Sequence, residues 1–407
     1  MRINSTYACI VVGAGPAGLA AALSLAHAGA QVFLSAQSPP IGGSSDTRTA
    51  ALFTGSVALL DNLGVWPDVV TESAPLRAIR IIDDTGRLLR APEVLFEAGE
   101  IGLDMFGWNV PNAALTAALW AAVRRHPAVS IVETARVADV SIADDGVSIT
   151  TAEGQRITAH LLAAADGRNS ISRTAAGITT KNWPYDQAAI ATRFTHNRPH
   201  HDVSTEFHRT AGPLTTVPMP GLASSLVWVE RPDVAGQLTA LDDAGFRATL
   251  QERLQGLLGS VGEIGPRRMF PLSGLTADVF GQNRVALIGE AGHVIPPIGA
   301  QGLNLGLRDA AALADCVADA IADGEDIGGT SALQRYHDAR QADVEGRSFA
   351  VDALNRTLLS NLLPVSLARG LGLHVIQAVG PLKRALIQQG LEPPGARPRL
   401  MRTRSDD

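Results

Sequence analysis

A strand, a glycine turn and a helix open this chain, and together they constrain its fold more than any other feature of the sequence. Residues 7–12 (YACIVV) form a continuous apolar run of strand length, as expected for a parallel strand with both faces covered. The turn 13–18 (GAGPAG) leads into the helical run LAAALSLAHAG and then into a second apolar strand, QVFLS. This order predicts a βαβ unit and therefore an α/β lobe of the Rossmann kind.

The glycines of this turn indicate a phosphate-binding site. Gly13 permits the tight turn, Gly15 lets the backbone approach a pyrophosphate, and Gly18 allows the helix to pack closely on the strand. Ala17 is the other small residue at the helix start. Because free N–H groups and the helix dipole favour negative charge there, we predict a dinucleotide cofactor rather than an incidental glycine-rich turn.

One element of this motif is missing. An acidic residue commonly binds a ribose hydroxyl at the end of the second strand, where this chain has Ala36 and Gln37. Gln37 can still donate or accept a hydrogen bond, and Asp46 and Arg48 follow shortly afterwards. We therefore expect Gln37 and Arg48 to contact the cofactor.

A second motif, LLAAADGRNSISR, ends an apolar strand at Asp166 and Gly167. A helix start that carries Ser and Arg follows directly, so backbone and cation could meet a phosphate here. An ordinary turn capped by Ser170 explains the same residues equally well. Asp166 and Gly167 stay candidates for cofactor binding.

The third motif is GEAGHVIPPIGAQGLNLGLRDA, residues 289–310, which follows the strand RVALIG. Pro and Gly together interrupt both regular periods, which favours a shaped loop that approaches a ligand. The glycines would let backbone amides face the negative N1/O2 edge of a reduced flavin at a helix start, and an acidic side chain could accept hydrogen bonds from ribityl hydroxyls. The predicted cofactor contacts are Glu290, Gly299, Gln301, Gly302, Leu303 and Asn304.

The middle of the chain reads as a second lobe. Residues 129–165 alternate like a β-meander, and four strand-like runs between 188 and 230 indicate an antiparallel sheet, with residues 76–90 as a hairpin of the same lobe. The histidines at 196, 200, 201 and 208 cluster there. No carboxylate or Cys stands at ligand spacing, so we assign no metal site and expect surface histidines.

Composition excludes several classes. The net charge of −6 argues against nucleic-acid binding, although the chain from Arg356 onward carries eight Lys and Arg against three acids. The two cysteines, Cys9 and Cys316, are far apart in sequence and are expected to be buried free thiols in a reducing cytoplasm. Neither a signal peptide nor an apolar run long enough to span a membrane is expected.

The segments GAGPAG, ADGRNSISR and GEAGHVIPPIGAQGLNLGLRDA, in this order, resemble the three fingerprints of the single-component FAD-dependent aromatic hydroxylases. The third resembles the signature of the ubiquinone-biosynthesis hydroxylases, the UbiH/UbiF-type and Coq6-type enzymes. DTRTAAL (46–52) is similar to a family segment that contacts FAD. Departures from the pattern are Glu290 in place of Asp, Ala36 in place of the ribose-binding acid, and Ala300 where Gly is common.

The resemblance implies a Rossmann-like FAD-binding domain, an interleaved antiparallel β-sheet substrate domain and a C-terminal helical extension. The expected FAD-binding domain comprises residues 1–75, 98–180 and 268–330, and the substrate domain residues 76–97 and 181–267. A helical region, 331–392, and a basic tail, 393–407, would follow.

The resemblance also implies the reaction, in which reduced FAD and O₂ hydroxylate a polyprenylated phenol or benzoquinol of ubiquinone biosynthesis. Electrons would come from NAD(P)H or a redox partner. Pro296 and Pro297 would shape a dry pocket beside the flavin, and His293 would orient that loop or act near the flavin. No general base is identified.

Several alternatives stay open. The substrate could be a soluble phenolic compound, or the chain could be a non-catalytic flavoprotein scaffold; a flavin halogenase is more remote. The apolar C-terminal segment with scattered cations could lie on the inner face of the membrane, could meet other ubiquinone-biosynthesis proteins, or could close the core as a helix pair. The oligomeric state is open, a homodimer included.

Overall fold

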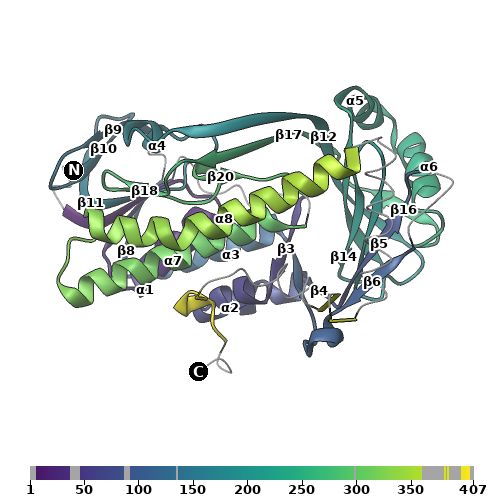
Figure 1. Ribbon diagram of the computed structural model, residues 1–407, viewed down its shortest axis with the longest axis horizontal. Helices are drawn as coiled ribbons and strands as arrows, with labels where there is room; N and C mark the ends of the chain where they lie inside the picture. The colour runs from purple at the N-terminus through teal and green to yellow at the C-terminus, as the bar shows by residue number, and fades with distance from the viewer. Residues whose placement is uncertain are drawn as a thin grey trace.

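The computed structural model describes residues 6–36, 46–86, 92–133, 136–297, 299–359, 380–381, 383–384 and 396–403, with the side chains of 133 and 348–359 left out. Two lobes lie side by side and are bridged by long strands along one edge (Figure 1). One lobe is a mainly parallel sheet with helices, and the other is a mainly antiparallel sheet. The α/β class predicted from sequence is confirmed.

The first lobe is built on a sheet in the order β18-β19-β11-β1-β2-β8. Strand β1 lies between β11 and β2 and is parallel to both, as the apolar run YACIVV predicted. The meander β9-β10-β11 turns back antiparallel. The strands of this sheet are β1 (Thr6–Val12), β2 (Val32–Ala36), β8 (Val129–Glu133), β9 (Val137–Ile142), β10 (Val147–Thr151), β11 (Arg156–Ala164), β18 (Gly281–Gln282) and β19 (Val285–Leu287).

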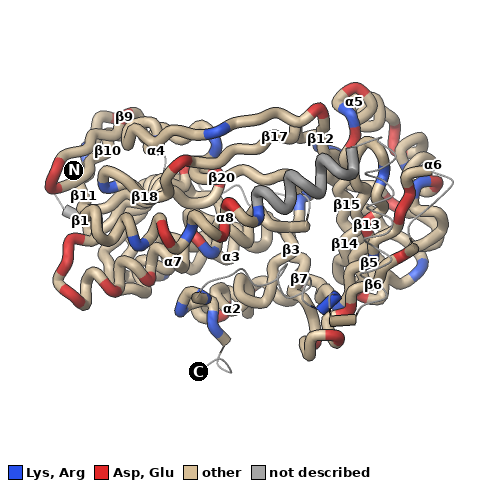
Figure 2. The backbone as a smooth tube through the Cα atoms, in the orientation of Figure 1, with Lys and Arg blue, Asp and Glu red and all other residues tan. Residues whose placement is uncertain are grey.

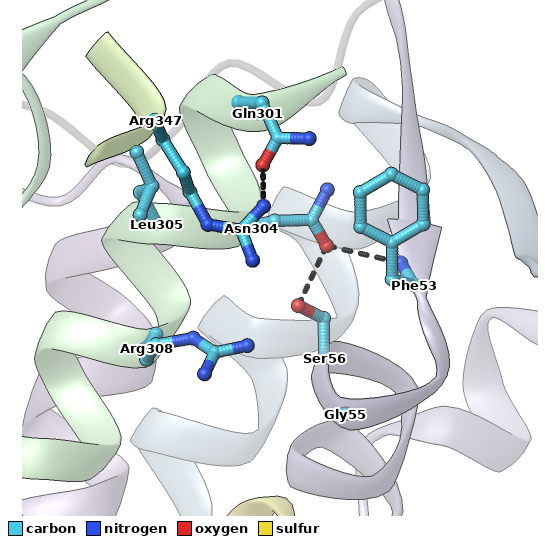
Figure 3. A pocket seen from close by; sticks show the side chains of 8 residues that line it. All are labelled: Phe53, Gly55, Ser56, Gln301, Asn304, Leu305, Arg308 and Arg347. Carbon is cyan, nitrogen blue, oxygen red and sulfur yellow. Dashed lines mark hydrogen bonds between the residues drawn. The ribbon is translucent and has the colours of Figure 1, made fainter. Parts of the chain in front are cut away.

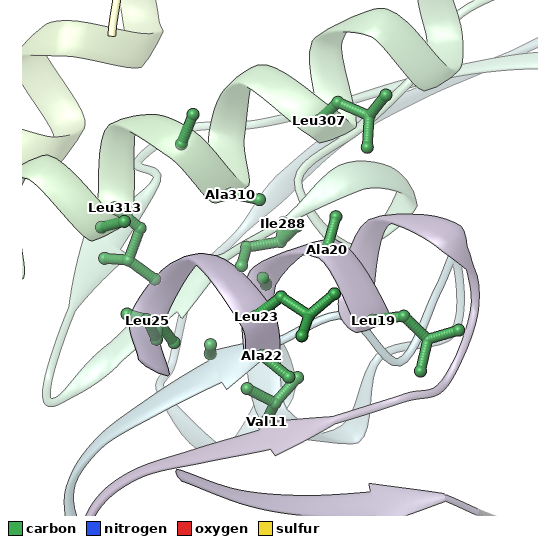
Figure 4. Close-up of a cluster of buried hydrophobic side chains, with 14 of the residues drawn as sticks. Val11, Leu19, Ala20, Ala22, Leu23, Leu25, Ile288, Leu307, Ala310 and Leu313 are labelled. Atoms are coloured by element: carbon green, nitrogen blue, oxygen red, sulfur yellow. The ribbon is translucent and has the colours of Figure 1, made fainter. Parts of the chain in front are cut away.

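Helices cover one face of this sheet. Cys9 and Val11 of β1 point into the core that they share with the helices, whereas Ile10 and Val12 point into a second core under the meander. Side chains from α1, α7 and β1 interlock in the first core (Figure 4). Both cysteines are buried and free. The helices of this lobe are α1 (Pro16–His27), α3 (Asn112–Arg125), α4 (Ile171–Ala175), α7 (Gln301–Asp323) and α8 (Thr330–Leu359).

The second lobe is a sheet in the order β20-β17-β12-β15-β14-β13-β5-β6, with β16 paired to β12. All the runs predicted between 188 and 230 are strands in it, and the hairpin predicted at 76–90 supplies β5, whereas its partner β6 lies beyond the predicted residues. The elements of this lobe are β5 (Ala78–Asp83), β6 (Val94–Glu97), β12 (Thr180–His196), β13 (Val203–His208), β14 (Leu214–Met219), β15 (Ala223–Glu230), β16 (Val261–Ile264), β17 (Arg268–Ala277), β20 (His293–Val294), α5 (Pro232–Ala240), α6 (Asp243–Arg253) and the 3-10 turn η3 (Ala98–Ile101).

Two segments expected in the FAD-binding domain lie in the second sheet. Residues 268–277 were assigned to the FAD-binding domain, but they form β17, which pairs along β12 in the second sheet. Residues 293–294, assigned to the same domain, form β20 and pair with β17. The reason is that β12 and β17 are long enough to run from one lobe to the other, so the sheet extends past the point at which the motifs suggested a change of domain.

A small third sheet connects the lobes. Its strand order is β3-β7-β4, and α2 leaves directly from the end of β3. On β7, Asn109 donates a hydrogen bond to the Pro218 carbonyl in the second lobe (2.7 Å). The hydroxyl oxygens of Thr49 on β3 and of Ser225 are hydrogen-bonded at 2.8 Å. The elements here are β3 (Thr49–Phe53), α2 (Thr54–Asn62), η1 (Trp66–Asp68), η2 (Val70–Glu72), β4 (Ala74–Leu76) and β7 (Gly107–Pro111).

The basic residues near the carboxyl end are not a free tail. Residues Arg399–Met401 form the turn η5, and Met401 is 1% exposed against α2. Arg399 donates hydrogen bonds to Asp315 and Asp319 of α7. Most of the apolar segment before it lies outside the described residues. Among the residues that the structure does describe, no helix is both long and apolar enough to cross a membrane.

Candidate active site

The glycine turn at the start of α1 has the geometry that its sequence predicted. A Cβ at Gly13, where φ is +111°, would lie 2.2 Å from the Ala165 carbonyl oxygen, and one at Gly18 would lie 2.1 Å from the Gly13 oxygen. Both glycines are therefore required by contact between chain segments. Gly15 differs, because a Cβ there would meet nothing within 4 Å. The N-terminus of α1 thus faces open space at Gly15, where a phosphate group fits.

The start of α1, the start of α7 and the turn at Gly289 converge at this point. A Cβ at Gly306 of α7 would lie 3.2 Å from the Ala17 methyl carbon and 3.3 Å from Cα of Gly289. Ala17, predicted as a cofactor contact, therefore has a packing role between α1, α7 and the 3-10 turn η4 (Gly289–Ala291). This contact sets the first and third motifs against each other.

Glu290 stands on η4 at the carboxyl end of β19 and is exposed. Arg48 lies near enough for the Glu290 charge to raise its pKa, although the hydrogen bond to Asp46 is the larger cause. The Arg48 guanidinium pairs with Asp46 at 2.8 Å and lies over the Phe270 ring at 5.1 Å. Burial would raise the pKa of Asp46, but Arg48 outweighs it and lowers that pKa. Gln37, the other predicted contact in this region, lies outside the described residues.

At the second motif the side chain of Asp166 is used by its own turn. It accepts hydrogen bonds from the Ser170 hydroxyl (2.5 Å) and the Ser172 amide (3.1 Å), while Ser170 caps α4. The capped-turn interpretation therefore accounts for the Asp166 carboxylate. Gly167 adopts a left-handed φ of +79°. Arg173 ties this turn to the third motif by donating to the Ala291 carbonyl at 2.8 Å.

His293, predicted as a catalytic candidate, is 2% exposed and directs Nε2 to the Asp309 carboxylate at 2.7 Å. This geometry favours the interpretation in which His293 orients the loop, because its Nε2 faces a buried acid. Pro296 is buried and Pro297 is exposed, so the two predicted pocket-shaping residues differ in their surroundings. Ile298, which follows them, is outside the described residues.

The turn before α7 is held in an unusual conformation. Gly299 (φ +68°) and Ala300 (φ +55°) are both left-handed, so Ala300, which stands where Gly is common, carries some strain. Gln301 donates to the Gly299 carbonyl at 2.9 Å. Gly302 is exposed and open, and Leu303 packs partly on the core.

Asn304 uses its whole side-chain amide inside the protein. Its oxygen accepts from the Phe53 amide (3.0 Å) and the Ser56 hydroxyl (2.7 Å), and its nitrogen donates to the Ala51 and Ala300 carbonyls at 2.7 Å each. An amide has two donors and one oxygen, so no capacity is left for a ligand. Its predicted role in cofactor binding is thereby limited to the backbone.

A buried ion-pair cluster behind this loop was not predicted. Asp309 is fully buried and accepts from the Gly289 amide (2.9 Å) and from Nε of Arg340 (2.7 Å), in addition to its contact with His293. Burial raises the pKa of Asp309, but His293 and Arg340 outweigh burial and lower it. A signal existed, since Asp309 lies on the same helix face as Leu305, Leu313 and Cys316, where a charge needs a buried partner.

The cluster continues along α8 to the turn before α7. Arg340 donates to Asp343 at 2.9 Å, and Arg347 donates to Asp343 at 2.8 Å and to the side-chain oxygen of Gln301. Acidic and basic segments accordingly adjoin along α7 and α8 (Figure 2). Burial lowers the pKa of Arg308, which also faces Asp343, to about 10.

A small cavity of about 10 Å³, enough for one water molecule, lies between α2, α7 and α8. Arg308 and Arg347 reach it from one side and Ser56 and Phe53 from the other (Figure 3). A second cavity, of about 410 Å³, is lined by α2, by Trp66 and Trp108, and by the docked carboxyl end at Arg402. No predicted site residue lines the second cavity.

The clustered histidines of the second lobe have protein partners. His196 contacts the Arg198 carbonyl and Ser224, His200 contacts the Met219 carbonyl, and His208 contacts Glu206 at 2.7 Å. Among the described residues, no group of His, Cys, Asp and Glu is placed to hold a metal ion. Contrary to the expectation of surface residues, His196 and His208 are buried.

The arrangement fits an FAD molecule. Gly15 and Gly302 leave open the N-termini of α1 and α7, where backbone amides favour negative charge. Glu290 makes no hydrogen bond to another described residue, so its carboxylate is available for ribityl hydroxyls. The first and third motifs, distant in sequence, therefore present open donors and one open acceptor on the same side of the first lobe.

Comparisons with known proteins agree with an FAD-binding fold. The model of the FAD binding domain family matches residues 6–346. The chain is 35% identical to the ubiquinone hydroxylase UbiL of Rhodospirillum rubrum, over 97% of this chain and 92% of that protein. It is 31% identical to the 3-demethoxyubiquinol 3-hydroxylase of Escherichia coli, over 95% and 99%. The crystal structure of p-nitrophenol 4-monooxygenase PnpA from Pseudomonas putida has the same fold, with a TM-score of 0.78 at 22% identity, over 97% of this chain and all of that one.

Proposed function

This chain belongs to the FAD-dependent aromatic hydroxylases, in the family of the ubiquinone hydroxylases, and on that premise we propose that it hydroxylates the ring of a polyprenylated phenol or benzoquinol in ubiquinone biosynthesis. The observation that carries the substrate class is the 35% identity to a ubiquinone hydroxylase along almost the entire chain. The fold alone would not do so, because one fold hosts many reactions.

The residues of the first lobe would hold the cofactor. The open N-terminus of α1 at Gly15 suits the pyrophosphate, and Glu290 suits the ribityl hydroxyls. The turn from Gly299 to Gly302 would place backbone amides at the flavin ring. Bound and reduced FAD supplies O₂ activation, so that one oxygen atom enters the ring and the other leaves as water, with two electrons from NAD(P)H or a redox partner.

The remaining task of the chain is to position the ring and exclude water. The third sheet is joined to the second lobe through the Thr49–Ser225 and Asn109–Pro218 hydrogen bonds, which hold the two lobes together at this point. Buried Pro296 stiffens the loop that leads to the flavin-facing turn. These contacts support a site enclosed between the two lobes.

Isotope incorporation tests the proposal. The protein reconstituted with FAD is supplied with a reductant, ¹⁸O₂ and a phenol that carries a short prenyl chain. The matched control is the same phenol without the chain. We expect a hydroxylated product with one ¹⁸O atom from the prenylated phenol only. Preference for the unprenylated phenol would favour a soluble substrate, and a protein that binds no FAD would favour the scaffold alternative.

We further propose that the protein binds peripherally to the membrane, where a prenylated substrate resides. The sequence 358–389 (LLSNLLPVSLARGLGLHVIQAVGPLKRALIQQ) is apolar with scattered cations, which suits a bilayer surface. Since residues 396–403 dock on α2 and α7, the test is an internal deletion of residues 360–379 that spares them. Sedimentation with anionic liposomes should fall in the deletion variant. Unchanged sedimentation would contradict the proposal, and loss only in the presence of a partner protein would assign the segment to protein contact.

A further inference from the structure

The loop from Gly289 to Gly302 carries four of the expected cofactor contacts, Glu290, Gly299, Gln301 and Gly302, yet its described residues contain no long regular element. Among the described residues between η4 and α7, the two-residue strand β20 is the only regular secondary structure. Its last turn places Gly299 and Ala300 in left-handed conformations. A strained turn persists only when its surroundings hold it in place, so other parts of the protein must fix this loop.

Both ends of the loop are attached to the same ion-pair cluster. At the first end, Asp309 accepts from the Gly289 amide and contacts His293, at 2.9 and 2.7 Å. At the other end, Gln301 donates to the Gly299 carbonyl and accepts from Arg347. The two ends are therefore joined through α7 and α8.

The connection between these ends is continuous and buried. Arg340 bonds to both Asp309 and Asp343, and Asp343 in turn receives Arg347. Asp309, Arg340 and Asp343 have side chains 0%, 2% and 3% exposed. Hydrogen bonds between charged groups in such surroundings are stronger and more directional than those in water.

We propose that Asp309, Arg340, Asp343 and Arg347, here termed the α7–α8 clamp, position the flavin-facing turn, and that Arg347 acts on it through Gln301. Arg347 is thus a positioning residue. The inference rests on the FAD site of the proposed function, but not on the identity of the aromatic substrate.

Arg347→Met provides the main test, because it removes the guanidinium while leaving Arg340 paired with both acids. The matched control is Arg335→Met, which removes an arginine of the same helix whose partner, Glu325, is exposed. We expect the dissociation constant of FAD to rise about tenfold in Arg347→Met, consistent with about 1.4 kcal/mol, and to stay unchanged in Arg335→Met.

Hydrogen exchange of the apoprotein separates positioning from general stability. In Arg347→Met, amides of residues 299–303 should exchange faster while those of β1 and α1 stay protected, and Arg347→Lys should restore part of the protection. A purely structural role would instead change exchange throughout α7 and α8. Equal FAD affinity and equal exchange in the Arg347 and Arg335 variants would overturn the proposal.

Asp309→Asn examines the first end of the loop. This change keeps the size of the side chain but leaves Arg340 with one carboxylate fewer, so overall stability is also expected to fall. The informative comparison is exchange at residues 289–294 in conditions where the variant is folded. Slow exchange there, equal to that of the unchanged protein, would contradict the clamp at this end. Because exchange is measured without FAD or substrate, these outcomes do not depend on whether the proposed hydroxylation is found.

Discussion

Gly15 and Gly18 illustrate how two glycines of one turn serve different purposes. Gly18 is needed for packing against Gly13, whereas Gly15 borders open space. Their positions in the motif predict these different roles, and the space around each glycine fits the role predicted for it.

Gly15→Ala should therefore leave the folded apoprotein intact and weaken FAD binding. The free energy of unfolding should change by less than about 0.5 kcal/mol, while the dissociation constant of FAD rises at least about tenfold, because the added methyl occupies the approach of the phosphate. Urea unfolding and flavin fluorescence titration measure the two effects. Gly236→Ala, at an open position of α5, is the control and should leave FAD affinity unchanged. Unchanged affinity in Gly15→Ala would place the pyrophosphate elsewhere.

Ala300→Gly should stabilise the protein by about 0.5–1 kcal/mol. In the folded protein, a left-handed conformation costs a residue with a Cβ about 1–2 kcal/mol, a cost that Gly does not have. Gly has more conformational freedom in the unfolded chain, and this offsets only part of the stabilisation. The control is Ala322→Gly in the last turn of α7, which is exposed and should be destabilising instead. Chemical unfolding of the two apoproteins checks the opposite signs. Destabilisation of both variants would show that Ala300 carries no strain.

At the scale of elements, the carboxyl end of the chain is held in place by contacts with helices that lie far away in the sequence. Met401 is 1% exposed against α2, and Arg399 bonds to α7 across more than eighty residues of sequence. Asn62 of α2 donates to the Leu400 and Arg402 carbonyls, at 2.9 and 3.1 Å. This segment therefore joins α2 to α7, the helix whose N-terminus borders the site.

Met401→Ala should cost about 2 kcal/mol of unfolding free energy, because a buried Met leaves a cavity when it is truncated. Arg399→Ala should cost at most about 1 kcal/mol, since its side chain is half exposed. Met269→Ala offers a matched control, because Met269 is 41% exposed. Denaturant midpoints of the three variants measure these differences. Equal losses for Met401 and Met269 would mean that the carboxyl end does not dock in solution.

At the scale of the whole molecule, the buried acids make stability depend on pH. Asp309 and Asp343 have pKa values lowered below their ordinary range, since the charges beside them outweigh burial. A group with a lowered folded pKa contributes stability above its unfolded pKa of about 3.9 and loses it as pH falls through the folded value. The fold should therefore be held most strongly near neutral pH.

Unfolding of the apoprotein at pH 7, 5, 4 and 3 should show a loss of stability that is concentrated below about pH 5. Asp343→Asn, which removes one of the two acids, should be less stable at neutral pH and should lose less on acidification. A variant with the same slope as the unchanged protein would exclude Asp343 from this dependence. Circular dichroism at each pH measures the midpoints.

Much of the fold could be read from short-range pattern. Strand β1, the glycine turn, α1 and α7 follow from hydrophobic runs and breaker residues within about twenty positions of one another. Most strands of the second sheet were also predicted, because alternation and turn residues mark them individually. The sheet to which β17 belongs was not predicted, since its partner β12 lies almost ninety residues earlier in the sequence.

The candidate site also contains residues that could be predicted from the sequence and residues that could not. Gly15, Glu290 and Gly302 could be predicted from the sequence, because the missing side chain of glycine and the carboxylate of glutamate are properties of the single residue. It could not show that Asn304 and Asp166 direct their side chains into the protein, because their partners lie on other elements or depend on the exact path of the turn.

The sequence by itself determined the α/β class, the three motifs and the kind of cofactor, because strand and helix periods, tight turns and phosphate binding depend on neighbouring residues. Only the tertiary structure decided the partners of Asp309 and Arg347 and the docking of Met401. Buried charges and side chains are stabilised by contacts between elements, and the folded chain alone brings these elements together.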